Sequence, residues 1–541
     1  MAEATSTETG GSVVRNSAVM AVGTIVSRLT GFGRNAVIGA AIGGLAVGNA
    51  YSTAQFFPQM IYELLLGGIL TSVLVPLLVR ARKTDADRGE AYTQRFVTLI
   101  VVLLAAATAI VVACAPLLAS ALTKQNTGLV TELSYLMLPM IFFYGVAAVL
   151  AAVLNTRGHF AAPMWAPILN NAVIIGTGVL FLVFFGATAP TPENMTAPMV
   201  LLLGGGTTAG IIVQVLGLLP ALRGVGFKMK WRFDFRELHL GHIGRLSGWM
   251  FCYVAVSQVS VIAVLRILNE AADRDPGAPG PFIYNNAYLL MMMAHGIVAV
   301  SIITALMPRM SAAAAEGRNS EVSMYLSQGI RLSGVILLPA TGAYVVFGST
   351  IASLLFGWGN FTASQADATG LVTAMAGLTL MPFAVSQLQT FVFYALPDTK
   401  TPALLNIPAV AMRVGIYLLT FAVLPAAAVA QGLMAGNGVS YVVAALLAAV
   451  LLRRRLGPLG MRRIGASLGK LAVAAAAGAL AGWAAVWLLP DGLSGSDKFN
   501  AVVDLVVGGI VLGVVYLGVA YALRAKEVTD VVSLVKGKLG R

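Results

Sequence analysis

Two arginines, Arg28 and Arg34, stand within the first long apolar stretch of the sequence. A guanidinium does not lose its proton at neutral pH, so neither side chain can enter hydrocarbon as a neutral group. Insertion scales put the cost of one arginine at the centre of a membrane helix at about 2.5–3.5 kcal/mol. Guanidinium groups bind phosphate and carboxylate oxygens through paired, charge-assisted hydrogen bonds. The two arginines therefore predict an anion-binding site or a water-filled cavity inside the membrane.

Two glycines between these arginines bear on their geometry. In an unbroken helix, side chains six residues apart such as Arg28 and Arg34 point about 120° away from each other. A break at Gly31 and Gly33 would turn both arginines toward one cavity and aim a positive helix N-terminus at an anion. The alternative is that the glycines only permit close helix packing. We predict a hinge, because an arginine stands on each side of the glycines.

Three further charges fall within apolar stretches of the sequence. Glu63 is predicted either to pair with Arg28 or Arg34 until an anion binds, or to form a structural ion pair. Arg266 is expected either to contact substrate late in transfer or to snorkel to the membrane surface. Arg413 either bonds to a neighbouring helix or lines a cavity.

The composition is that of a polytopic membrane protein. Of the 541 residues, 58% are hydrophobic and 11% are charged, with a mean hydropathy of +0.85, whereas a soluble domain carries about 25% charged residues. The net charge of +13 is spread over short loops, which excludes a nucleic-acid-binding protein with a soluble basic face. The cysteines, Cys114 and Cys252, lie in apolar stretches, so we interpret them as packed thiols rather than a disulfide or a metal site.

Fourteen apolar stretches are long enough to cross the hydrocarbon core, which takes about 17–25 residues. They predict an all-α polytopic membrane protein with helices near residues 16–43, 48–79, 93–121, 130–154, 160–186, 198–222, 245–270, 282–307, 322–356, 367–396, 402–425, 428–452, 466–489 and 499–523.

The basic residues between these helices predict their orientation. With a cytoplasmic N-terminus, 25 lysines and arginines fall in inside segments, and the outside loops hold only Lys124, Arg274 and Lys498. Loops on the cytoplasmic side of a membrane protein carry the excess of basic residues. We therefore expect both termini to lie in the cytoplasm.

Two short turns six spans apart, residues 154–163 and 396–403, each contain a Thr, a basic residue and a Pro that begins the next helix. They predict two six-helix bundles related by a repeat, with two helices appended, as in secondary transporters. The expected order is a cytoplasmic tail, an N-terminal bundle, a basic interfacial linker, a C-terminal bundle, a basic cytoplasmic loop, two helices and a cytoplasmic tail. These segments are residues 1–15, 16–222, 223–244, 245–452, 453–465, 466–523 and 524–541.

The predicted linker between the bundles interleaves basic residues with Phe227, Trp231, Phe233 and Phe235. This pattern favours a segment lying on anionic lipid headgroups. An ordinary positive-inside loop would explain the charge but not the aromatic residues.

The run Ser27–Asn35 resembles the signature SRxxGFxR of the MurJ (MviN) family, the lipid II flippases of the MOP exporter superfamily. Residues 56–68 (FFPQMIYELLLGG), the two turns and the run Leu306-Met307-Pro308 are similar to that family as well. The resemblance covers nearly the whole chain and is of the actinobacterial type. It implies a MATE-like fold in which the last two helices form a groove for the lipid tail.

The chain departs from the family pattern near the expected substrate site. Asn49 stands where many members carry an acidic residue, and Tyr62 and Glu63 stand where many carry two arginines. An arginine that many members place on the eighth helix is also missing. We expect Asn49, Tyr62 and Glu63 to contact substrate together with Arg28, Arg34 and Arg266.

The resemblance implies a transporter rather than an enzyme. It would move lipid II, the undecaprenyl-diphosphate-linked peptidoglycan precursor, from the inner to the outer leaflet of the bacterial plasma membrane by alternating access. We expect no cofactor and no nucleic acid, and the identity of any coupling cation stays open. The expected partners are lipid II, membrane lipids, and cell-wall synthesis or division proteins.

Alternative functions are a polysaccharide-lipid flippase or a drug/cation antiporter of the same superfamily, a membrane glycosyltransferase, and a non-transporting scaffold. The sequence contains no phosphate-binding ATPase loop, so an ion gradient or the membrane potential must supply the energy.

Overall fold

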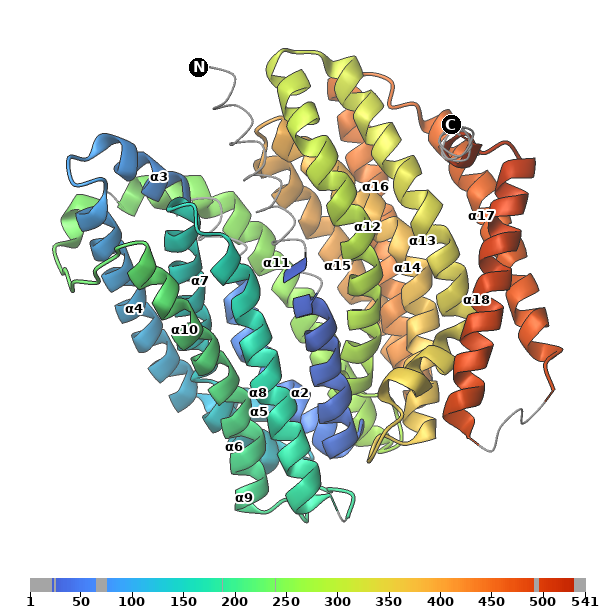
Figure 1. Cartoon of the computed structure of the whole chain (residues 1–541), viewed down its shortest axis with the longest axis horizontal. Coiled ribbons are helices and arrows are strands. Elements are labelled where there is room, and N and C mark those ends of the chain that lie inside the picture. The colour runs from blue at the N-terminus through green and yellow to red at the C-terminus, as the bar shows by residue number, and fades with distance from the viewer. Residues whose placement is uncertain are drawn as a thin grey trace, which may run out of the picture. The chain divides into compact units, whose positions relative to one another are not determined.

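The structure, a computed structural model, describes residues 22–23, 26–64, 75–186, 188–238, 240–490 and 496–529. Regular secondary structure in these ranges is helical (Figure 1). The first helix described at length covers residues 26–42. It is followed by α2 (Ala46–Leu64), α3 (Val75–Thr84), α4 (Glu90–Ala113), α5 (Ala115–Leu122), α6 (Thr127–Met137), α7 (Met140–Thr156), α8 (Ala161–Phe185), α9 (Ala197–Val200), the π-helical η2 (Leu201–Gly205), α10 (Gly206–Gly224), the 3-10 helix η3 (Phe235–Leu238), α11 (Leu240–Arg274), α12 (Pro281–Ala315), α13 (Asn319–Phe356), α14 (Ala363–Ala395), α15 (Lys400–Val423), α16 (Ala426–Leu456), α17 (Met461–Trp487) and α18 (Asp497–Ala522).

Within the described residues, 12 helices are long and apolar enough to cross a membrane. They correspond to the last 12 predicted spans. The first two predicted spans, residues 16–43 and 48–79, lie partly outside the described residues; their described parts, residues 26–42 and α2, are helical. The all-α multi-span fold predicted from hydropathy is therefore confirmed.

Three spans are interrupted where the sequence predicts smooth helices. The third is divided at Cys114 between α4 and α5, with Pro116 in the first turn of α5. The fourth is divided at Leu138 and Pro139. Proline has no backbone N–H, so it cannot donate the hydrogen bond that a continuing helix requires. The sixth contains the π-helical turn η2, where Gly204 lies so close to Leu136 on α6 that a Cβ would meet it at 2.8 Å.

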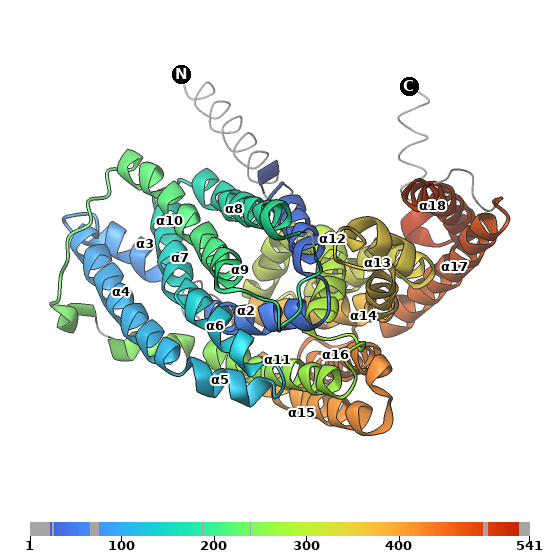
Figure 2. The same cartoon turned by 90° about the horizontal axis from the view of Figure 1, so that it is seen from below.

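The chain divides into two compact units, Met1–Gln258 and Val259–Arg541. In the first unit α10 packs against α8 and α7, and α2 packs against α6. In the second unit α14 packs against α12, α13 and α16. In both views α17 and α18 lie side by side (Figures 1 and 2).

Glycines bring α17 and α18 into backbone contact. A Cβ at Gly478 would meet the Leu512 carbonyl oxygen at 2.7 Å, and one at Gly482 would meet the Gly508 carbonyl oxygen at 2.7 Å. Small residues four apart permit such close approach of membrane helices. The pair also packs on α13, where Phe347 contacts Leu512.

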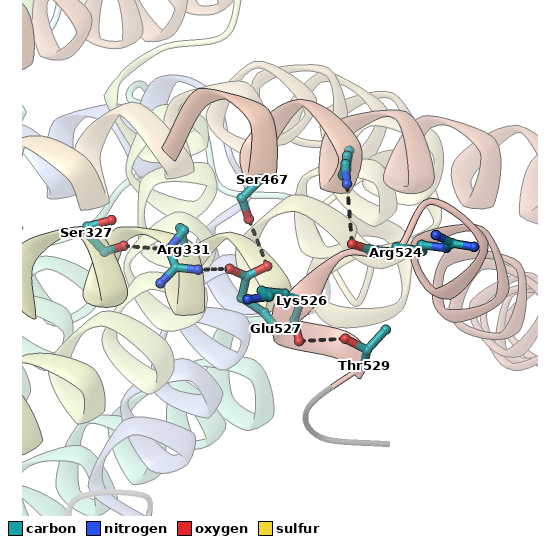
Figure 3. Close-up of polar contacts among 8 residues, drawn as sticks. Ser327, Arg331, Ser467, Arg524, Lys526, Glu527 and Thr529 are labelled. Carbon is teal, nitrogen blue, oxygen red and sulfur yellow. Dashed lines mark hydrogen bonds and ion pairs between the residues drawn. The ribbon is translucent and has the colours of Figure 1, made fainter. Parts of the chain in front are cut away.

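The chain after α18 turns back onto the second unit (Figure 3). Arg524 adopts a left-handed conformation (φ 52°), and Ala525 and Val528 then pack with Leu471 on α17. Glu527 forms an ion pair with Arg331 on α13 and accepts a 2.9 Å hydrogen bond from Ser467 Oγ on α17. We call residues 524–529 the C-terminal latch, because it joins α13, α17 and α18.

Electrostatics favour the charged form of the latch carboxyl. Burial alone would raise the pKa of Glu527, whose side chain is 5% exposed. Hydrogen bonds from its own backbone amide and from Ser467, together with the Arg331 guanidinium, outweigh burial and lower that pKa below its ordinary value.

Candidate functional site

Residues 26–42 form one uninterrupted helix that carries both predicted arginines. Arg28 and Arg34 are each partly buried. No break occurs at the predicted hinge in this structure: Gly31 and Gly33 lie within the helix, and a Cβ at Gly31 would meet the Asn171 amide at 3.4 Å. A Cβ at that distance would be in ordinary contact with α8, and bending at the glycines stays a prediction about another conformation.

Asn171 on α8 organises the helix around the two arginines. Its Nδ2 donates to the Ser27 carbonyl oxygen (3.1 Å) and to Thr30 Oγ1 (3.0 Å), while its Oδ1 accepts from Arg34 Nη1 (3.5 Å). Asn171 is buried, so these bonds replace water for its amide. The amide fixes the turn between the arginines and orients Arg34.

Arg34 is surrounded by neutral polar groups. Besides Asn171, it donates from Nε to Asn35 Oδ1 (3.4 Å). Its charge also acts on the phenols of Tyr51 on α2 and Tyr144 on α7. Among the described residues, the hydrogen bonds of this guanidinium go to amide oxygens rather than to carboxylates. Such partners orient the cation without neutralising it, which leaves it able to bind an anion.

The other predicted residues of the first unit lie on α2. Asn49 is buried in the first turn. The Tyr62 ring packs against Tyr144, with ring centroids 4.8 Å apart. Glu63 is exposed and accepts a 3.1 Å hydrogen bond from Gln258 Nε2 on α11. Its predicted pairing with an arginine therefore stays a prediction for another state.

Tyr144 connects the predicted residues of α2 to Arg34. It packs on Tyr62 and feels the Arg34 charge. Tyr51, the other phenol near Arg34, shares a 3.0 Å hydrogen bond with Thr207 on α10. The first unit thus contains two contacts among these residues, Tyr62 with Tyr144 and Arg34 with Asn171, and the Arg34 charge acts on Tyr144.

The two candidate arginines of the second unit have different surroundings. Arg266 on α11 is exposed. Arg413 on α15 donates from Nε to Ser440 Oγ (2.7 Å) and from Nη1 to Ser260 Oγ (3.4 Å), and it lies over the Tyr441 ring at 4.6 Å. Of the two interpretations of Arg413, bonding to neighbouring helices is the one that these contacts match.

The sequence pointed to the arginines but not to the phenols. Tyr51 and Tyr144 resemble ordinary apolar helix residues in the sequence, and only packing shows that they face Arg34. Asn171 was visible as a polar residue inside a span, for which helix–helix hydrogen bonding is the ordinary expectation. In the described ranges no three His, Cys, Asp or Glu side chains are arranged to hold a metal ion.

Comparison with known proteins places this chain in a family. The family described as "Lipid II flippase MurJ" matches residues 38–502, most of the chain. The chain belongs to the MurJ family. It is 26% identical over 527 residues to a probable lipid II flippase MurJ from Synechocystis, covering 94% of this chain and 95% of the relative. It is also 26% identical over 405 residues to a lipid II flippase MurJ from Burkholderia cenocepacia, covering 73% of this chain and 75% of the relative.

Solved structures share the MurJ fold seen here. A lipid II flippase MurJ in an inward closed conformation matches with a TM-score of 0.71 at 16% identity, over 92% of this chain and 97% of that one. An inward-facing multidrug resistance MATE family transporter of the MOP superfamily matches with a TM-score of 0.61 at 17% identity, over 79% of this chain and 95% of that one. The predicted MATE-like fold is confirmed, and the membrane placement of the chain follows from its spans and its family.

Proposed function

We propose that this protein is a lipid II flippase that moves the precursor across the plasma membrane by alternating access. The observation that carries the proposal is Arg34, a permanent cation that donates to Asn171 within the first unit of a MurJ-like fold. The relatives named above are themselves called lipid II flippases. A diphosphate is the part of lipid II that a guanidinium binds best.

In this proposal the residues of the first unit have distinct roles. Arg34 and Arg28 bind the diphosphate, Asn171 holds the helix that carries them, and Tyr62 and Asn49 shape the site. Glu63 exchanges its Gln258 hydrogen bond for an arginine when the site empties. Arg266 meets the headgroup late in transfer.

The remaining assignments follow from the same proposal. In this proposal both termini lie in the cytoplasm, and the chain follows the order of bundles and linkers predicted from the sequence. The last two helices guide the polyprenyl tail. Cell-wall synthesis or division proteins are the expected protein partners. The likeness to MATE transporters is one of fold, and a cation antiporter is disfavoured because the candidate site residues include three arginines, Arg28, Arg34 and Arg266, and one carboxylate, Glu63.

Growth of a flippase-depleted bacterial strain tests the proposal. The double variant Arg28→Ala/Arg34→Ala is expected to reach normal levels in the membrane and to fail to restore growth, because both diphosphate ligands are gone. An external probe should then find less lipid II in the outer leaflet than with the wild-type protein. Arg454, an exposed arginine at the end of α16, provides the control through Arg454→Ala. Normal growth with the double variant would refute the proposal.

A further inference from the structure

The segment that joins α10 to α11 is fastened along one side to α4. Gln94 Nε2 donates to the Lys228 carbonyl oxygen (2.7 Å), and Arg232 Nε donates back to Gln94 Oε1 (3.0 Å). The Arg232 amide donates to Thr98 Oγ1 (3.1 Å). Arg95 Nε donates to Asp234 Oδ2 (2.7 Å). The Lys228 carbonyl, Arg232 and Asp234 therefore face α4.

Three apolar side chains of the same segment are exposed. Residues 227–234 contain no helix. Met229, Trp231 and Phe233 are 39%, 61% and 65% exposed. Exposed apolar patches of this kind mark sites of membrane or protein contact.

Exposed cations flank this apolar patch. Lys228, Lys230 and Arg236 are exposed, and the only carboxylate from 228 to 236 is Asp234. Asp234 is paired with Arg95, and that contact lowers its pKa below the ordinary value, so this carboxyl stays ionised and turned toward α4. The exposed side chains of the segment are thus apolar or cationic, apart from the paired Asp234.

The position of the segment in the chain decides what covers the patch. Residues 228–236 begin four residues after one membrane span ends at Gly224, and the next span begins at Gly248. Both ends of the segment are therefore held near the membrane surface. Trp and other aromatic side chains favour the headgroup region, and lysines and arginines near the membrane attract anionic lipid.

We propose that residues 228–236 form a lipid anchor on an anionic leaflet, with α4 as its support. Met229, Trp231 and Phe233 lie among the lipid headgroups and the first methylene groups. Lys228, Lys230 and Arg236 contact lipid phosphates. The anchor is independent of lipid II transport and fixes the end of α4 to the bilayer surface.

Tryptophan quenching tests the apolar half of this proposal. The full-length protein is placed in lipid nanodiscs, and the emission of the Trp231→Phe variant is subtracted from that of the wild type to isolate Trp231. Phosphatidylcholine brominated near the glycerol end should quench this signal, whereas aqueous acrylamide should quench it poorly. Efficient quenching by acrylamide and none by brominated lipid would overturn the proposal.

Lipid competition tests the cationic half. In mixed nanodiscs at low salt, brominated phosphatidylglycerol should quench Trp231 more than brominated phosphatidylcholine does, with a preference on the order of a hundredfold for three cations. The triple variant Lys228→Gln/Lys230→Gln/Arg236→Gln should lose this preference and keep its elution volume and helical content. The preference should survive in Arg453→Gln/Arg454→Gln/Arg462→Gln, which removes the same charge from the other unit. Equal loss in both triple variants, or no loss in the first, would refute specific headgroup contact.

Discussion

Arg34 donates hydrogen bonds to the amide oxygens of Asn35 and Asn171, and these partners decide what the side chain can bind. A carboxylate partner would neutralise the guanidinium and compete with an anionic substrate. Amide partners carry no net charge, so they restrict the orientation of the guanidinium without neutralising it. Such a side chain lowers the cost of binding a phosphate, because the desolvation of the cation has already occurred during folding.

The geometry of this guanidinium predicts that lysine cannot replace Arg34. Arg34→Lys keeps the charge but loses the planar pair of donors and the bond to Asn171. A charge-assisted hydrogen bond contributes about 1.5–3 kcal/mol, so transport at limiting lipid II should fall by about tenfold to a hundredfold. The measurement is lipid II transfer in proteoliposomes, with Arg454→Lys as the control. Transport within twofold of wild type would show that only the charge of Arg34 matters.

At the scale of single residues, the sequence identified the two arginines of the candidate site but not the side chains that surround them. Arg28 and Arg34 stand out because an arginine in an apolar span has no neutral form. Asn171, Tyr51 and Tyr144 do not stand out, because amides and phenols occur in membrane helices for packing alone. Only the packing of α2, α7 and α8 shows which of these side chains reach Arg34.

At the scale of elements, the two similar turns hold equivalent positions in their units. Arg157 of the first turn donates to the Val225 carbonyl oxygen (3.1 Å) and lies over the Phe227 ring, directly after α10. Asp398 of the second turn pairs with Arg455, at the end of α16. Each turn thus contacts the chain where the sixth span of its bundle ends. This agreement supports the repeat predicted from the turns, although the contacting residues differ.

Close packing of α17 on α18 predicts that alanine substitutions at two glycines of α17 differ in their effect on stability. Gly482→Ala would place a Cβ 2.7 Å from the Gly508 carbonyl oxygen, so α18 must move, at a cost of about 1–3 kcal/mol. Gly465→Ala meets nothing within 4 Å and should be neutral or slightly stabilising. Thermal unfolding in detergent compares the two variants. Equal unfolding temperatures would contradict the backbone contact between α17 and α18.

The ion pair of the C-terminal latch predicts that substitutions of its two residues have non-additive effects on stability. It also predicts that the contribution of Glu527 depends on pH. Glu527→Gln or Arg331→Met leaves one buried partner without its counter-charge, and each should cost about 2 kcal/mol, less than a fully buried pair because Arg331 is partly exposed. The double variant Arg331→Met/Glu527→Met should be closer to wild type than either single variant. The folded-state pKa of Glu527 is lowered, so its contribution is complete above the unfolded-state pKa of about 4.3 and is lost as the pH falls through the folded-state value.

Unfolding temperatures of these variants at pH 7 and near pH 3.5 provide the check. The difference between wild type and Glu527→Gln should shrink at the lower pH. Additive single-variant effects that do not change with pH would show that the latch carboxylate does not stabilise the fold.

At the scale of the whole molecule, hydropathy predicted the fold well, whereas the orientation expected from the basic residues stays a prediction. A stretch of apolar residues must form internal backbone hydrogen bonds in lipid, so its length translates directly into a helix. The breaks at Cys114 and Pro139 and the π-helical turn at Gly204 were not predicted, because all three leave the mean hydropathy unchanged. The division into two units follows from packing that a single sequence does not record.

The energy source gives the last prediction. Transfer of lipid II moves negative charge outward, and a membrane potential that is negative inside favours this by about 2.3 kcal/mol per net charge per 100 mV. Arg28 and Arg34 offset part of the substrate charge while it is bound, so the gain depends on the net charge of the loaded site. In proteoliposomes, collapsing the potential with valinomycin and potassium should slow lipid II transfer. Collapsing only the pH gradient with nigericin should leave the rate unchanged, and the opposite pattern would show that proton movement drives transport.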